Sequence, residues 1–228
     1  MRILAIDCST EWLSVAVRDG EVLRERREHA LQAHSQRVLP LVQEVLDEAA
    51  LALDAVDGIA FGAGPGSFTG VRIACGVAQG LALGLSRPVV AVSTLEALAE
   101  DACERHGAES VLACLDARMH EVYVAAYERR GGRWHQASAA QVVKPAELAV
   151  PVGHWFGAGN GFAAYPTLTR LVAAGSDATL IPTAGAVARL ASARFAAGEG
   201  VAAEDALPHY VRHRVALTSA ERAVGAVL

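Results

Sequence analysis

The sequence predicts a two-lobed α/β protein whose lobes are duplicates of one plan. A buried strand ending in an aspartate, a short turn, a second strand, a hairpin and a third strand occur twice, around Asp7 and around Asp116. The chain has 228 residues, which is long for one compact domain and suits two small lobes. We therefore expect an N-terminal lobe over residues 1–106 and a C-terminal lobe with a tail over residues 107–228.

The composition narrows the class of protein. A formal net charge of -5 disfavours a protein that binds nucleic acid on its own, because such binding needs a basic surface. The apolar run after Arg2 ends at Asp7 and the stretch over 70–85 contains Arg72 and Gln79, so we expect neither a signal peptide nor a membrane span. Isolated cysteines in apolar stretches predict reduced thiols in the core of a cytosolic protein. They are Cys8, Cys75, Cys103 and Cys114.

The first lobe is predicted to alternate strands with helices. Apolar runs bounded by turn residues mark the strands, and Asp19-Gly20 marks a hairpin turn. Apolar residues recur at helical spacing after residue 35, and Pro40 is expected to kink this helix or delay its start. Ser93 with Glu96 resembles a capping box for a later helix. The predicted strands are 2–6, 12–17, 21–27, 58–61 and 88–92, and the predicted helices are 35–50, 70–85 and 93–106.

The second lobe is predicted to repeat this plan with shorter elements. Asp116 follows its first strand, and Gly131-Gly132 turns the chain into the third. The glycine cluster over 157–161 is interpreted as a plain turn before a short helix. The predicted strands are 111–115, 122–128, 133–137, 152–156 and 179–181, a helix is predicted over 183–197, and the path of the tail over 205–215 is left open.

The glycine-rich turn over 62–70 is the strongest local signal. It links a strand to a helix, where free amides can bind an anion. Val71 stands where a Walker A lysine would be, and the glycine spacing differs from the dinucleotide fingerprint. We interpret Gly64, Gly66 and Gly70 as structural residues of a tight turn that needs positive φ.

The helix after this turn carries two columns of small residues at four-residue spacing. Gly76, Gly80 and Gly84 form one column, and alanines form the other. Each interior glycine costs a helix about 1 kcal/mol relative to alanine. Three on one face indicate that another backbone approaches closely, either a partner helix or the sheet of the same lobe. We favour the partner.

The aspartate turn of the first lobe is a candidate phosphate site. Asp7, Ser9 and Thr10 could hold phosphate and magnesium through amides and hydroxyls; equally, Asp7 could cap the turn. The equivalent turn of the second lobe, 116–120, has no Ser, Thr or Gly, which disfavours a two-sided phosphate clamp. The histidines lack the spacing or the carboxylate support of a metal site; His209 and His213 are four apart but lie beside arginines.

Together these segments closely resemble the TsaB (YeaZ) family, over nearly the whole chain. The matching segments are ILAID at 3–7, GPGSFTGVRI at 64–73, QGLA at 79–82, LDARM at 115–119 and PHYVR at 208–212. The second of these is the most specific. The resemblance implies the duplicated actin-like (Hsp70-related, ASKHA) α/β fold, in which each lobe has a mixed sheet flanked by helices.

The resemblance also implies a role. TsaB proteins are regarded as degenerate, non-catalytic partners of TsaD, the enzyme that transfers threonylcarbamoyl from its adenylate to the adenosine beside the anticodon of certain tRNAs. TsaE, a small ATPase, joins the pair, and TsaC makes the adenylate. The expected partners are therefore TsaD, TsaE and, indirectly, TsaC and tRNA. A homodimer of the isolated chain and a cytoplasmic location are also expected.

One departure from TsaD-type enzymes supports an accessory role. Those enzymes carry an HxxxH metal pair after the strand that follows the glycine-turn helix, and here the positions hold Thr94 and Leu98. Neither side chain can replace a histidine ligand. We therefore expect no catalytic residue, no metal and no cofactor of its own, with nucleotide bound only in the complex.

The partner interface is predicted on two helices of the first lobe, through which the family pairs. The predicted contact residues are Val38, Leu39, Val42, Val45 and Leu46 on one helix, and Arg72, Gly76, Gln79, Gly80 and Leu83 on the other.

Two other functions remain as alternatives. One is a small actin-like kinase or ATPase that uses Asp7 and Ser9 with magnesium. The other is a peptidase, because relatives have been labelled glycoproteases. The sequence shows no evident nucleophile–base pair or zinc motif for the latter.

Overall fold

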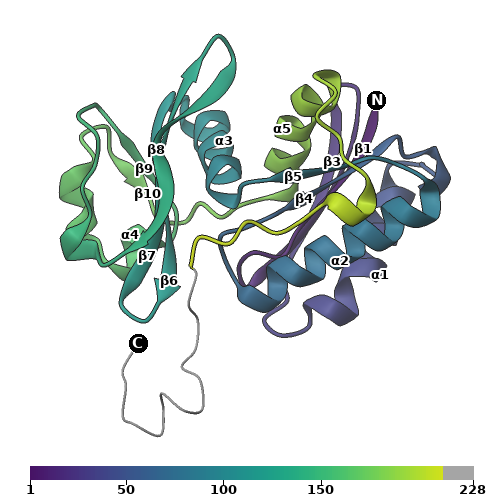
Figure 1. Ribbon diagram of the computed structural model, residues 1–228, viewed down its shortest axis with the longest axis horizontal. Coiled ribbons are helices and arrows are strands. Elements are labelled where there is room, and N and C mark those ends of the chain that lie inside the picture. The colour runs from purple at the N-terminus through teal and green to yellow at the C-terminus, as the bar shows by residue number, and fades with distance from the viewer. Residues whose placement is uncertain (213–228) are drawn as a thin grey trace, which may run out of the picture.

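The computed structural model describes residues 1–212 and consists of two lobes, each built on a five-stranded sheet (Figure 1). The segment over 213–228, which includes His213 and the end of the tail left open above, lies outside the described residues. Helices cover the sheets, and two of them lie between the lobes. The predicted α/β fold with two lobes is confirmed.

The first sheet has the strand order β3-β2-β1-β4-β5. β1 pairs antiparallel with β2 and parallel with β4, so the sheet is mixed. Asp19 pairs with Val22 across a two-residue hairpin loop whose Gly20 has a φ of 57°, as the Asp-Gly signal predicts. The strands are β1 (Arg2–Asp7), β2 (Trp12–Asp19), β3 (Val22–His29), β4 (Gly58–Gly62) and β5 (Val89–Val92).

The second sheet repeats this arrangement. Its order is β10-β9-β6-β7-β8, with β6 antiparallel to β7 and parallel to β9. Read from its own first strand, the order and the directions equal those of the first sheet, so the predicted duplication is confirmed. The strands are β6 (Ser110–Arg118), β7 (Glu121–Arg130), β8 (Arg133–Val143), β9 (Phe156–Ala158) and β10 (Ser176–Asp177).

The two shortest strands differ from their predicted positions. β9 begins at Phe156, where the predicted strand ended, and enters the glycine cluster, while β10 precedes the residues 179–181 that we predicted. Both are two or three residues long and are fixed by parallel pairing to distant strands, which a local pattern does not reveal. Gly157 lies within β9, and a side chain there would clash because a Cβ would be 2.6 Å from the Phe162 ring.

The helices follow the predicted ranges closely. α1 runs through Pro40 without interruption, and α2 begins two residues before its predicted start because the Ser67 hydroxyl caps it by accepting from the Gly70 amide. The helices are α1 (His34–Glu48), α2 (Phe68–Leu85), α3 (Thr94–His106), α4 (Gly161–Ala164) and α5 (Ala184–Ala196), and the 3₁₀ turns are η1 (Leu53–Ala55), η2 (Pro145–Glu147), η3 (Pro166–Leu171) and η4 (Ala203–Asp205).

The predicted capping box at the start of α3 does not form. Ser93 makes no side-chain cap bond and instead lies 3.3 Å from the Tyr127 hydroxyl, while Glu96 pairs with Arg194. Both partners come from elsewhere in the chain, and these contacts replace the local one. The helix ends at Gly107, which takes the left-handed conformation expected of a C-cap.

The two lobes exchange the helices that follow their last strands. α3 comes after the first sheet but packs on the second, where Leu95, Leu98 and Ala102 join its core. α5 comes after the second sheet but packs on β1, β2, β4 and β5 of the first. The predicted boundary at residue 106 falls between β5 and β6. However, α3, which we assigned to the first lobe, packs on the second sheet, and α5, which we assigned to the second lobe, packs on the first. The two helices contact each other between the sheets (Figure 1).

A buried polar cluster joins α3 to α5. The Asp101 carboxylate accepts from the Thr183 hydroxyl at 2.8 Å and pairs with Arg189 at 3.1 Å. Arg189 also pairs with Glu100, whose second oxygen accepts from the Trp134 indole N–H of β8. Burial raises the pKa of Asp101 to about 7, against the lowering effects of Thr183 and Arg189.

The segment over 199–212, which we call the strap, runs from the first lobe to the second. It begins with mutual backbone bonds between Val201 and Val89, and the Ala206 carbonyl then accepts from the Gln79 side chain at 3.0 Å. His209 donates its amide to Ala63 at 2.7 Å. The strap ends at Arg212, which pairs with Glu121 of β7. It therefore links the two lobes across the space between them.

We expect Asp101→Asn to change how stability depends on pH. The folded-state pKa of Asp101 lies above its ordinary value, so this group stabilises the fold fully below about pH 4 and loses that contribution as pH rises through about 7. The asparagine cannot titrate. The free energy of unfolding of the variant minus that of the wild type should therefore rise across this window, by at most about 1.4 kcal/mol per pH unit.

Urea denaturation at several pH values between 4 and 8 measures this difference. Asp54→Asn, at an exposed carboxylate of the first lobe, is the matched control. Parallel pH curves for Asp101→Asn and the wild type would contradict the assignment.

Candidate functional site

The glycine turn packs directly on the aspartate turn that follows β1. A Cβ at Gly66 would lie 2.3 Å from the Ser9 carbonyl oxygen, and a Cβ at Gly70 would lie 1.8 Å from that of Cys8. The Ser67 amide donates to the Ser9 carbonyl at 2.7 Å. Glycine is required at these positions because no side chain fits between the two turns.

This geometry refines the predicted role of the three structural glycines. Gly64 has a φ of 100°, as the turn interpretation expects. Gly66 and Gly70 do not have positive φ; their constraint is the close approach of the backbone. Near the start of α2, the amides of Gly70 and Val71 both donate to Ser67.

The Asp7 side chain is buried beneath the contact between the two turns. Its side chain accepts from the Ser9 amide at 2.9 Å and from the Ser9 hydroxyl at 2.7 Å, both through Oδ1. The other oxygen, Oδ2, is buried without a hydrogen-bond partner in the described chain, and a Cβ at Gly62 would lie 1.8 Å from it. Burial raises the pKa of Asp7 to about 6. Through Oδ1, Asp7 thus caps its own turn.

The three residues predicted to bind phosphate are not all exposed to solvent. Asp7 and Ser9 are 1% and 2% exposed, so only Thr10 is left partly accessible. Thr10 lies in a cleft of about 780 Å³ between the lobes, opposite Asp116 and Arg118. Ser9 and Thr10 are among the residues that line this cleft, and Asp7 is not.

The second-lobe turn in this cleft has an unusual backbone. Arg118, Met119 and His120 have φ values of 60°, 54° and 59°, the left-handed region that favours glycine. The Asp116 side chain accepts from the Arg118 amide at 3.0 Å, and the Asn160 side chain accepts from the Asp116 amide at 2.9 Å. The turn is thus held by side chains, without the small polar residues of a phosphate clamp.

Thr94 and Leu98, at the positions of the TsaD-type histidines, have structural contacts. The Thr94 hydroxyl donates to the Pro65 carbonyl at 2.8 Å and its amide donates to Gly64 at 2.9 Å. Leu98 is fully buried, and a Cβ at Gly159 would lie 2.6 Å from it. Thr94 therefore fixes the glycine turn to α3, and Leu98 packs α3 on the second lobe.

The two small-residue columns of α2 have opposite environments. The alanines face the first sheet and are at most 1% exposed: Ala74, Ala78 and Ala82. Gly76, Gly80 and Gly84 face solvent, and a Cβ at any of them would have no atom within 4 Å. The alternative that these glycines pack on their own sheet is wrong.

The structure corrects the predicted interface on α1. Its apolar stripe packs on the first sheet, and four of the five predicted contact residues are at most 4% exposed: Val38, Val42, Val45 and Leu46. Leu39 is 53% exposed and lies on the outer face, while Leu41 takes the core position. A side chain within the core of its own lobe cannot also contact a partner.

The predicted interface residues on α2 are exposed to solvent, with one exception. Arg72, Gly76, Gly80 and Leu83 are exposed, and Leu83 is 71% exposed. Gln79 is half-buried and bonded to the strap. The sequence reasoning missed the strap as a structural element, because its backbone bonds to distant residues have no local pattern.

Residues 1–212 contain no group of three His, Cys, Asp or Glu side chains that could hold a metal ion. His209 is used by the strap, and burial lowers its pKa. α2 is long and apolar enough to cross a membrane, but a third of it is buried and it packs against β4.

The two sheets have the same strand order, each first strand carries an aspartate towards its end, and two helices lie between the lobes. These features define a duplicated actin-like (ASKHA) protein. Residues 26–221 match the family described as "TsaD: tRNA N6-adenosine threonylcarbamoyltransferase". The chain is 42% identical to the Escherichia coli protein named "tRNA threonylcarbamoyladenosine biosynthesis protein TsaB", over 95% of this chain and 96% of that one. The Haemophilus influenzae protein of the same name is 38% identical, over 94% and 95%.

A solved structure gives the same result. YeaZ from Pseudomonas aeruginosa superposes with a TM-score of 0.85 and 47% identity, over 92% of this chain and 99% of that one. The chain therefore belongs to the TsaB (YeaZ) family, within the larger TsaD-like group.

We expect the same substitution at two glycines of α2 to have opposite effects on stability. Gly70→Ala places a Cβ against the Cys8 carbonyl and should lower the free energy of unfolding by about 1–3 kcal/mol or more. Gly80→Ala points into open space and should raise it by up to about 1 kcal/mol through helix propensity. Chemical denaturation of both variants measures the contrast. Equal destabilisation by the two changes would contradict the described packing.

Proposed function

We propose that this chain is a non-catalytic accessory subunit that pairs with TsaD and enables transfer of threonylcarbamoyl to the adenosine beside the anticodon of tRNA. Its relatives from Escherichia coli and Haemophilus influenzae are named as tRNA threonylcarbamoyladenosine biosynthesis proteins. Cytoplasmic tRNA is the substrate of that chemistry, so we place the chain in the cytoplasm. TsaE and, indirectly, TsaC and tRNA are the further partners.

The main support for the proposed pairing is the exposed glycine stripe of α2, formed by Gly76, Gly80 and Gly84. Three interior glycines each cost the helix about 1 kcal/mol, and nothing in the described chain uses the space that they leave. A partner helix could approach this face to backbone contact, as in small-xxx-small pairs. Leu39 and Leu83 add exposed apolar area on α1 and α2. A homodimer of the isolated chain could use the same face.

The accessory role rests on the contacts of the residues that would otherwise act. Thr94 and Leu98 occupy the histidine positions and are committed to packing. Asp7 is covered by the glycine turn and bonded to Ser9. We therefore assign no catalytic residue, metal or cofactor to the chain, and any nucleotide would bind at a surface completed by the partner.

One observation supports the kinase or ATPase alternative: the cleft of about 780 Å³ between the lobes could hold a ligand. Magnesium-dependent nucleotide affinity of the isolated chain, lost in Asp7→Ala, would favour that alternative. The closed position of Asp7 argues against it.

Reconstitution tests the proposed function directly. The chain alone, mixed with tRNA and the threonylcarbamoyl-adenylate source, should leave the tRNA unmodified. Addition of TsaD and TsaE should give modification, and omission of this chain from the complete mixture should abolish it. Mass spectrometry of digested tRNA measures the product. Modification by this chain in the absence of TsaD would refute an accessory role.

We expect Gly80→Leu to abolish pairing without unfolding the subunit. The leucine has open space within the described chain, so the melting temperature should stay at or above that of the wild type. At a helix–helix contact the same side chain would overpack, at a cost of about 1–3 kcal/mol or more. Light scattering of mixtures with TsaD measures pairing.

Ala196→Leu is the matched control for this experiment. It adds the same side chain at an exposed position of α5, on the other face of the first sheet. This variant should pair as the wild type does. A Gly80→Leu variant that melts early yet still pairs with TsaD would end the interface hypothesis.

A further inference from the structure

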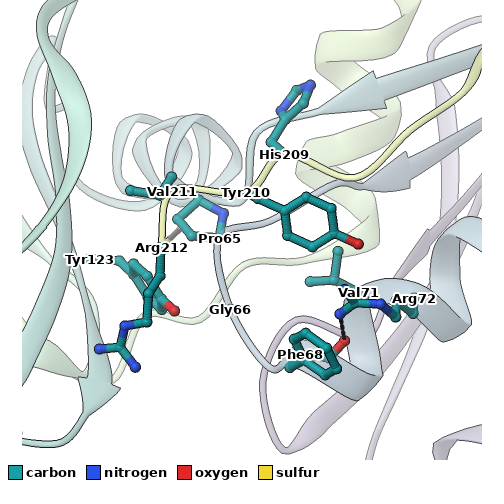
Figure 2. Close-up of a pocket in the computed structure, with 10 residues that line it drawn as sticks. All are labelled: Pro65, Gly66, Phe68, Val71, Arg72, Tyr123, His209, Tyr210, Val211 and Arg212. Atoms are coloured by element: carbon teal, nitrogen blue, oxygen red, sulfur yellow. Dashed lines mark hydrogen bonds between the residues drawn. The ribbon is translucent and has the colours of Figure 1, made fainter. Parts of the chain in front are cut away.

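A small pocket of about 340 Å³ opens where the strap passes the first turn of α2 (Figure 2). Phe68 and Arg72 line it from α2, and Tyr210 lines it from the strap. Phe68 and Tyr210 are 54% and 52% exposed, so two aromatic rings stand open at its rim. Figure 2 shows these three side chains gathered together on one side of the pocket.

Arg72 is held in a fixed orientation by this arrangement. Its guanidinium carbon lies 3.3 Å from the centre of the Phe68 ring and 4.8 Å from that of Tyr210. One of its nitrogens donates to the Phe68 carbonyl at 2.9 Å. The long side chain is therefore ordered before any partner arrives, which reduces the entropy lost on binding.

The charge of Arg72 is not neutralised within the described chain. No carboxylate among residues 1–212 pairs with it, whereas Arg212 across the same pocket pairs with Glu121. A guanidinium has five N–H donors, and the bond to Phe68 uses one. Arg72 thus presents donors of fixed geometry that match the two oxygens of a carboxylate.

The pocket continues the exposed stripe of α2. Arg72, Gly76 and Gly80 are spaced by four residues and are all exposed, so they lie along one face of the helix. A partner helix on the glycines would therefore pass its end over Arg72. Arginine and tyrosine are also the residues that dominate binding energy at interfaces.

We propose that the pocket of Phe68, Arg72 and Tyr210 receives an acidic side chain of the partner subunit, with Arg72 as the anchor. This inference rests on the proposed pairing with TsaD and adds to it the chemistry of one contact. A carboxylate satisfies the Arg72 charge, and its methylene groups pack on the two rings. A nucleic-acid phosphate is the less favoured occupant, because the chain carries a formal net charge of -5.

Binding of TsaD to three variants tests the inference by calorimetry. Arg72→Gln should raise the dissociation constant at least about tenfold and leave the melting temperature unchanged. Tyr210→Ala should raise it less, because it removes only one of the two rings that contact Arg72. Tyr210→Phe keeps the ring and should bind as the wild type does. Arg170→Gln, at an exposed arginine of the second lobe, is the control for loss of surface charge.

Two further measurements distinguish an ion pair made by Arg72 from a purely structural role of this residue: the salt dependence of the affinity and the effect of charge reversal. The affinity of the wild type should fall as salt rises, and the curve of Arg72→Gln should be flatter, because the ion pair is screened. Binding lost in Arg72→Glu should be restored by an Asp or Glu to Lys change at one position of TsaD.

The outcomes separate the inference from the function on which it rests. If Gly80→Leu prevents pairing and Arg72→Gln binds as the wild type does, the pairing stands and the acidic-anchor inference falls. If Arg72→Gln lowers only the affinity of the complex for tRNA, the occupant is a phosphate and the inference is again overturned. If the wild type does not bind TsaD, both fall.

Discussion

The contact between the glycine turn and the aspartate turn is the constraint on which the rest of the first lobe depends. Gly66 and Gly70 bring two backbones together at distances that leave no room for a Cβ. This contact sets where α2 begins, and therefore how the helix is rotated about its axis. With that rotation fixed, the alanines meet the sheet and the glycines meet solvent.

The same contact determines what chemistry the first lobe can offer. It covers the Asp7 carboxylate, which is buried and accepts hydrogen bonds from the Ser9 amide and hydroxyl. Thr94 completes the arrangement by bonding to the Pro65 carbonyl from the start of α3. The Asp7 turn is therefore buried, whereas the glycine face of α2 is exposed to solvent.

The lobes are coupled by elements that cross between them. α3 and α5 each pack on the sheet of the other half of the chain, and the Asp101–Arg189 pair lies where they meet. The strap adds a third link, from the Ala63 carbonyl to Glu121 of β7. Because the strap also carries Tyr210, the pocket at the start of α2 depends on the same connection that joins the lobes.

The sequence by itself determined the duplicated strand plan, the hairpins and the two faces of α2, because periodicity and turn chemistry are local properties. Only the tertiary structure decided which features were already used inside the molecule. The apolar stripe of α1, with Val42 and Val45, packs on its own sheet, and Ser93 bonds to Tyr127 instead of capping its helix. β9, β10, the exchanged helices and the strap are fixed by partners far along the chain, and no local pattern encodes such pairings.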